Sequence, residues 1–187
     1  MKRQPFFQLT QSAVEQLAAN FDTPLLVLSL EQIERNFRFL KTNLPRVKFY
    51  YAMKANPDMR ILEKMAEMGA SFDVASDGEI KTLAGLGIDG ERMIYANPIK
   101  TTAGLKACNY AGVNKMTFDN IAEVEKMAKA CPGATVLLRF RIDNSSAHVD
   151  LNKKFGAARQ DAVALLKAAK DAGLDAAGIC FHVGSQV

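Results

Sequence analysis

The sequence predicts an α/β fold in which parallel strands curl into a barrel wrapped by helices, a (β/α)8 TIM-type barrel of which about six strands are present. Strand-like segments alternate with segments of helical periodicity. Such alternation with short turns means a parallel sheet, either open and doubly wound or closed. Four strands each carry one apolar face and one face with a polar group near the carboxyl end, which favours the barrel. The strands are expected to begin near Val47, Ser71, Arg92, Lys115, Thr135 and Ala176.

The first residues of the chain precede this repeat. A short amphipathic helix is expected near Ala13–Leu17, followed by a turn at Asp22-Thr23-Pro24. Leu25–Leu30 is predicted as a buried strand, because it is a short continuous apolar run. Ser29 is expected to cap the next helix, whose apolar stripe is formed by Ile33, Phe37 and Leu40.

The later helices are placed by signals at their ends. Small hydroxyl and carboxylate residues open them, and glycine closes them. A long polar loop, Asp143 to Gly156, precedes the last one, and loops of that length after a barrel strand usually carry function or disorder. These signals predict helices along Ile61–Met68 with Gly69 at the end, from Asp77, from Thr101 or Thr102, over Asn120–Ala130 and over Ala157–Ala172.

One strand delivers a lysine to its end. The run that starts at Val47 is expected to place Lys54 at the carboxyl edge of the sheet, with Asn56 capping the next helix and Pro57 in its first turn. Active sites of barrels assemble at that edge. Lys54 is therefore interpreted as an amine that holds a carbonyl compound as a Schiff base, although a surface lysine whose stem lies along the protein remains an alternative.

Alternation along four strands places Lys54, Asp73, Arg139 and His182 around one pocket. Arg139 and Asp73 could form a pair that makes each tolerable in a buried site. His182 is followed by Gly184-Ser185, whose backbone and hydroxyl could approach a phosphate closely.

Composition excludes several classes of protein. The net charge of +4 is spread along the 187 residues, which argues against nucleic acid or an anionic membrane as partner. No apolar run approaches membrane-spanning length. Cys108, Cys131 and Cys180 are far apart and without CxxC spacing, which suits reduced thiols in a cytoplasmic protein and gives no reason to expect a metal.

Five short segments together resemble one family, the fold-III pyridoxal-phosphate-dependent basic amino acid decarboxylases, of the ornithine decarboxylase and bacterial lysine/ornithine decarboxylase type. They occur in the expected order over nearly the whole chain. The segments are Tyr51-Ala52-Met53-Lys54-Ala55-Asn56, Phe72-Asp73-Val74-Ala75-Ser76, Tyr95-Ala96-Asn97-Pro98-Ile99-Lys100, Lys154-Phe155-Gly156 and Phe181-His182-Val183-Gly184-Ser185.

The resemblance implies roles for the pocket residues. Lys54 is similar to the lysine that forms the internal aldimine with pyridoxal 5'-phosphate (PLP), and Asp73 to the carboxylate beside it. Arg139 resembles the arginine that contacts this network. His182 resembles the histidine that stacks on the pyridine ring, and Ser185 the hydroxyl on the cofactor phosphate. Lys54 and His182 are thus the expected catalytic residues.

The resemblance also implies partners and domains. The substrate would be ornithine, lysine or both, with putrescine or cadaverine as product. Asp119 and Lys154 resemble residues that form salt bridges across the family's homodimer. Because the family's enzymes are longer, residues 1–30 are expected to belong to a further β domain and residues 31–187 to a partial PLP-binding barrel, with little activity alone.

Three alternatives remain open from the sequence. A diaminopimelate, arginine or carboxynorspermidine decarboxylase would use the same scaffold. A non-catalytic homologue that only binds a regulatory partner, as antizyme inhibitors do, would keep the fold. A cofactor-free Schiff-base aldolase would keep Lys54 without a phosphate contact at Ser185.

Overall fold

Six parallel strands form one sheet in the computed structural model, which describes residues 7–142 and 154–184. Each strand pairs with the next one in sequence, so the strand order never reverses as it would in a doubly wound sheet. This order is that of a barrel wall, and the predicted fold class is confirmed. The strands are β1 (Tyr50–Ala52), β2 (Ser71–Val74), β3 (Met93–Tyr95), β4 (Lys115–Phe118), β5 (Thr135–Arg139) and β6 (Asp175–Cys180).

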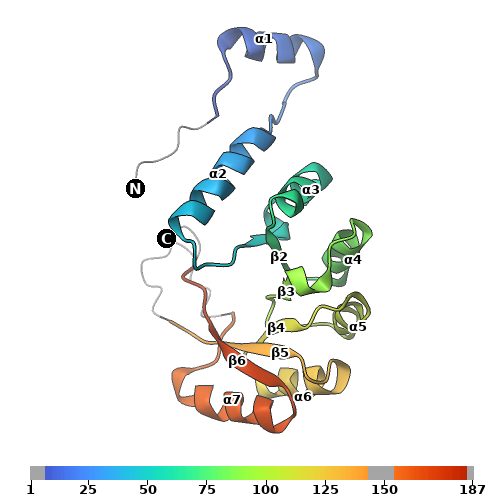
Figure 1. The fold of residues 1–187 in the computed structure, drawn as a ribbon, viewed down its shortest axis with the longest axis vertical. Coiled ribbons are helices and arrows are strands. Elements are labelled where there is room, and N and C mark those ends of the chain that lie inside the picture. Colours follow the sequence, from blue (N-terminus) through green and yellow to red (C-terminus); the bar gives the residue numbers. More distant parts are fainter. Residues whose placement is uncertain (1–6, 143–153, 185–187) are drawn as a thin grey trace.

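Helices follow one another around the outside of the curved sheet, from α3 to α7 (Figure 1). Right-handed crossovers that all proceed in one direction place every connecting helix on the same face. The helices are α1 (Gln11–Asn20), α2 (Leu30–Asn43), α3 (Met59–Glu67), α4 (Asp77–Gly85), α5 (Thr102–Ala111), α6 (Ile121–Ala130) and α7 (Ala162–Asp171), with short 3-10 turns η1 (Met53–Ala55), η2 (Gly90–Arg92) and η3 (Arg159–Asp161).

Side-chain alternation along the strands separates a covered face from a partly open one. In β5, Val136 and Leu138 are fully buried beneath the helices, whereas Leu137 and Arg139 on the other face are only half-buried. In β2, Phe72 is fully buried and Asp73 is half-buried. The predicted alternation is therefore confirmed for these strands, and the polar side chains face the inside of the barrel wall.

Several helix caps follow from the sequence. The Ser29 hydroxyl accepts a hydrogen bond from the backbone N–H of Gln32 at the start of α2, as predicted. Thr101 and Asn120 cap α5 and α6 in the same way. Such caps satisfy backbone donors that the first turn leaves without a partner.

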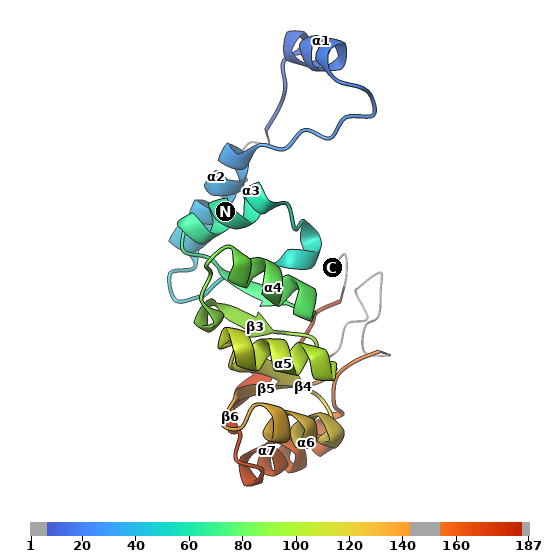
Figure 2. The same ribbon diagram turned by 90° about the vertical axis from the view of Figure 1, so that its right-hand side faces the viewer.

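The predicted strand over Leu25–Leu30 is wrong. The structure has no strand between Leu25 and Ser29, and the apolar side chains there are exposed, Leu26 by 87%. An apolar run becomes a strand only where it pairs with a neighbouring edge, and among the described residues β1 pairs with β2 and not with this run. The preceding helix α1 stands away from the sheet and its covering helices (Figures 1 and 2).

Three boundaries also differ from the prediction. The first strand begins at Tyr50 instead of near Val47, and it ends at Ala52. Helix α3 is capped by Asp58 and not by Asn56, whose side chain accepts from the Asp58 N–H and so forms a turn before the helix. Helix α7 starts later than Ala157, because Ala157 makes strand-like hydrogen bonds with the backbone of Arg139 and Arg141.

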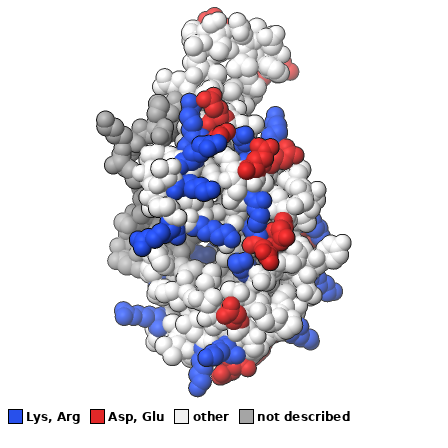
Figure 3. Space-filling view, in the orientation of Figure 1, with Lys and Arg blue, Asp and Glu red and all other residues white. Residues whose placement is uncertain are grey.

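Both signs of charge occur on the face shown in Figure 3, with several Lys and Arg side chains across its middle, and the α1 region carries few charges. Across residues 7–142 and 154–184, no helix is long and apolar enough to cross a membrane.

Candidate functional site

A cavity of about 410 Å³ lies at the carboxyl ends of the strands. Its lining includes Lys54 from the turn after β1, Asp73 from β2, Arg139 from β5 and His182 just after β6. Its volume is within the range of small-molecule sites. The structure therefore brings the four predicted residues to one cavity, at the edge where barrel enzymes place their chemistry.

Lys54 is held by a rigid turn while its side chain stays exposed. Met53 beside it is buried in the core and anchors η1. The Tyr51 hydroxyl donates to the backbone oxygen of Asn56 over 3.0 Å, which closes the turn around the lysine. The backbone at Lys54 is thus held in place, and the exposed amine can be reached by a ligand in the cavity.

Burial raises the pKa of the Asp73 carboxyl to about 6, and nearby Glu79 adds to this, while the positive charges of Lys54 and Arg139 oppose it. The expected direct pairing of Asp73 with Arg139 is wrong, since no ion pair within 4 Å joins these two described residues. Instead, the Arg139 guanidinium carbon lies 5.2 Å from the centre of the Phe155 ring. The Asp73 carboxyl therefore lines the cavity near the positive charges of Lys54 and Arg139 without a direct ion pair to Arg139.

The His182 ring is oriented by a backbone N–H two residues further along the chain. The Gly184 N–H donates to Nδ1 of His182 over 2.9 Å, so the neutral ring carries its proton on Nε2. Gly184 adopts a positive φ of 102°, which glycine allows without strain. Burial, Arg139 and Lys54 all lower the pKa of His182, which favours the neutral ring. Ser185 lies outside the described residues.

The two residues expected at a subunit interface have contacts within the chain. The Asp119 carboxylate accepts from the Gly156 N–H over 2.8 Å, joining the end of β4 to the segment that follows residue 153. Lys154 lines the cavity, and its Nζ lies 5.0 Å from the centre of the Phe155 ring. Their interface role remains a prediction.

The sequence reasoning missed one wall of the cavity. Asn97 and Pro98, after β3, and Thr117, on β4, line it. The Thr117 hydroxyl is buried and has no hydrogen-bond partner among the described residues. Alternation with the apolar Met116 and Phe118 places Thr117 on the inner face, by the same pattern that places Asp73 there.

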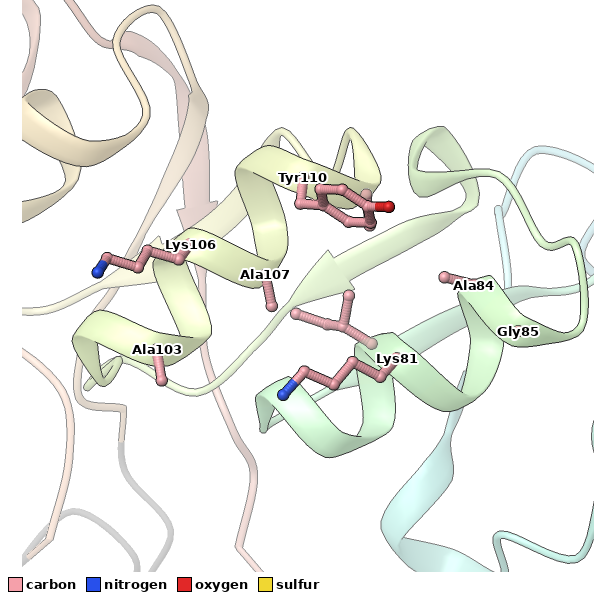
Figure 4. A pocket seen from close by; sticks show the side chains of 9 residues that line it. Lys81, Ala84, Gly85, Ala103, Lys106, Ala107 and Tyr110 are labelled. Carbon is pink, nitrogen blue, oxygen red and sulfur yellow. The ribbon is translucent and has the colours of Figure 1, made fainter.

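A larger groove of about 610 Å³ lies on the outer surface between α4 and α5 (Figure 4). It is less suited to catalysis, because its lining is mostly small and apolar and holds two lysines without an acid or a histidine. Small residues and three long side chains line it, among them Ala84, Ala103, Ala107, Lys81, Lys106 and Tyr110.

The donor set at the strand ends suits an organic anion with a carbonyl group. It combines an amine, a guanidinium, an imidazole, a carboxyl and a free hydroxyl. Within the described part of the chain, no three His, Cys, Asp or Glu side chains are grouped so that they could hold a metal ion. PLP, an aromatic aldehyde with a phosphate, matches these groups. An amine suits its aldehyde, an imidazole suits its aromatic ring, and positive charge suits its phosphate.

Comparison with known proteins gives concordant matches. A family model described as pyridoxal-dependent decarboxylase, pyridoxal binding domain, matches residues 30–187. A lysine/ornithine decarboxylase of Selenomonas ruminantium is 54% identical over 180 residues, which is 96% of this chain and 46% of the relative. An antizyme inhibitor 2 of Xenopus laevis is 42% identical over 153 residues, 82% of this chain and 33% of that protein.

The fold agrees with a solved structure of similar kind. The crystal structure of lysine decarboxylase from Selenomonas ruminantium superposes with a TM-score of 0.91 at 54% identity, over 96% of this chain and 47% of that chain. The chain thus spans about half the length of this curated relative and of this solved structure.

Proposed function

Since the chain belongs to the pyridoxal-dependent decarboxylases and carries their pyridoxal-binding domain, we propose that it forms the cofactor-binding barrel wall of an enzyme that decarboxylates ornithine, lysine or both to putrescine or cadaverine. The observation that carries the proposal is the convergence of Lys54, Asp73, Arg139 and His182 on one cavity. The 54% identity to a lysine/ornithine decarboxylase supports the choice of a basic amino acid.

PLP would be held through Lys54, Asp73, Arg139, His182 and Ser185. When bound, it supplies an aldehyde that captures amines and a ring that accepts the electron pair left by a departing carboxylate. The protein's task is to bind, orient and manage protons around it.

Each residue has a task that its surroundings suit. Lys54 would hold the cofactor through its amine, which a ligand in the cavity can reach. Asp73, with a pKa of about 6, can hold or release a proton beside Lys54 near neutral pH. The neutral His182 ring, turned by the Gly184 N–H, offers a flat face against which an aromatic ring can stack.

The assembly and location form part of the same proposal. We place the enzyme in the cytoplasm as a homodimer, with Asp119 and Lys154 at its interface and residues 1–30 packed on a further β domain. The exposed apolar side chains of Leu25–Leu28 and the free thiols of the chain support this.

The test is covalent trapping of the cofactor. The purified chain is mixed with PLP, the visible absorption is recorded, and borohydride is added before the labelled peptide is identified by mass spectrometry. We expect the label on Lys54, its loss in Lys54→Ala, and no change in the matched variant Lys81→Ala, which alters an exposed lysine at the outer groove. A label on another lysine would refute the assignment of Lys54.

Substrate choice is tested separately. Release of carbon dioxide is measured for ornithine, lysine, arginine, diaminopimelate and carboxynorspermidine, with the longest natural form of the protein. Ornithine and lysine should react, and preference for another amino acid would replace the substrate part of the proposal.

A second candidate is a non-catalytic binding homologue, favoured by the 42% identity to an antizyme inhibitor. It predicts neither a trapped cofactor on Lys54 nor carbon dioxide release. The presence of Lys54, Asp73, Arg139 and His182 on one cavity supports the enzyme instead.

A further inference from the structure

A lysine with no exposed amine lies directly behind the cavity wall. Lys100 ends the segment Tyr95-Ala96-Asn97-Pro98-Ile99-Lys100 between β3 and α5, and it is only 1% exposed. Lysine is almost never buried to this extent without partners. Burial lowers the pKa of Lys100, while Glu123 opposes this.

The Lys100 amine contacts three backbone carbonyls and one carboxylate. Nζ donates to the carbonyl oxygens of Thr117 over 2.6 Å, Pro98 over 3.0 Å and Asn97 over 3.4 Å. It also lies 3.1 Å from a carboxylate oxygen of Glu123. One cation thus joins the loop after β3 to the end of β4.

Glu123 connects this cation to α6. Its carboxylate accepts from the backbone N–H of Lys100 over 3.3 Å and contacts the Lys126 amine. Lys126 in turn donates to the Lys100 carbonyl over 2.5 Å. Asn120 caps the same helix by accepting from the Glu123 N–H over 3.0 Å, which fixes the first turn of α6.

The three carbonyls that Lys100 holds belong to the three residues of the missed wall, Asn97, Pro98 and Thr117. We propose that Lys100, paired with Glu123, is a positioning residue that fixes this wall, and with it the Thr117 hydroxyl, against the ligand in the cavity. The part that concerns the cofactor rests on the proposed function above.

A stabilising role explains the buried Lys100–Glu123 pair less well than a positioning role does. A buried ion pair often contributes no more than well-packed apolar residues of the same volume. The lysine ammonium, however, carries three N–H donors on one atom, and here they reach carbonyls of two separate segments. The geometry therefore indicates that Lys100 positions the backbone of the cavity wall, and that its amine acts through this backbone and not on the reacting atoms.

The experiment compares Lys100→Met with the wild-type chain. Methionine keeps an unbranched apolar stem, and Glu123 retains Lys126 as a partner. The second variant is Glu123→Gln, which weakens the hold on Lys100 without removing its amine. The control is Lys106→Met, an exposed position on α5, the helix that follows Lys100. Folding is checked by urea unfolding, and backbone hydrogen exchange is followed by mass spectrometry together with PLP titration.

We expect faster exchange in peptides that cover 96–100 and 117–119 in Lys100→Met, with the remaining strands unchanged. PLP affinity should fall by about 10- to 100-fold, because loss of supporting contacts and misplacement by an ångström have effects of this size. Glu123→Gln should show a smaller change in the same peptides, and Lys106→Met none.

Three outcomes would overturn the inference. The first is a folded Lys100→Met with unchanged exchange at the wall. The second is faster exchange at the wall with unchanged PLP affinity. The third is failure of both variants to fold, because the pair would then hold the whole barrel. If the wild-type chain itself does not bind PLP, the proposed function fails, while the exchange data still decide whether Lys100 fixes the wall.

Discussion

Replacing Asp73 by asparagine should make the ligand-free protein more stable. Burial raises the pKa of this carboxyl from 3.8 to about 6, so the charged form is unfavourable in the folded state. At about 1.36 kcal/mol per pKa unit, this amounts to about 3 kcal/mol at pH values above 6. Asparagine has the same shape and no charge, so Asp73→Asn should recover up to that amount.

The sign of the pH dependence follows from linkage. A carboxyl whose pKa is raised by folding binds its proton more tightly in the folded state, so its penalty is absent below pH 3.8 and complete above pH 6. The gain from Asp73→Asn should therefore be about 3 kcal/mol at pH 7.5, about half of that at pH 5, and small at pH 4.

Urea unfolding at these three pH values measures the gain. Asp161→Asn, at an exposed position, is the control and should change the unfolding free energy by less than about 0.5 kcal/mol. Equal stability of Asp73→Asn and wild type at pH 7.5, or a gain that does not shrink in acid, would show that burial does not penalise this charge. The same variant should slow labelling of Lys54, since the neighbouring carboxylate is gone.

Three further results are expected. The NMR titration of His182, assigned with His182→Asn, should have its midpoint below 6.5, and stability should decline as pH falls below 6.5 because the unfolded chain binds this proton more readily. Thr117→Val should stabilise the ligand-free chain by about 1–3 kcal/mol in urea unfolding, since it removes a buried hydroxyl without a partner among the described residues, and a loss would reveal an interaction of that hydroxyl. Leu62→Ala in the core should cost about 2–5 kcal/mol and Leu26→Ala less than about 0.5 kcal/mol, and similar costs would contradict the exposure of Leu26.

Local patterns predicted most of the repeat correctly. The strands at Ser71, Lys115 and Thr135 begin where alternation indicated, and Ser29 and Thr101 open their helices as expected. These features depend on residues close together in sequence, so local physical chemistry determines them.

The errors concern features that depend on distant parts of the chain. Leu25–Leu30 has the composition of a strand, but no neighbouring edge accepts its hydrogen bonds. Ala157 lies in a helical pattern, yet Arg139 and Arg141 draw its backbone into strand-like pairing. Tertiary contacts override local preference in both places.

The buried pair of Lys100 and Glu123 could not be predicted from the sequence, because it too depends on tertiary contacts. Lys100 and Glu123 are 23 residues apart, and only the neighbouring placement of β3 and β4 brings them together. The motif that ends at Lys100 resembles a segment of the family, but the physical role of its lysine depends on three carbonyl contacts that only the fold creates.

The order of the strands has a mechanical consequence. Lys54 follows the first strand and His182 the last, yet both reach the same cavity because the sheet bends round on itself. A ligand that contacts both side chains would therefore link the first strand to the last one. The affinity for such a ligand would depend on the curvature of the sheet. A substitution in the core beneath the outer helices could therefore lower the affinity without contacting the ligand.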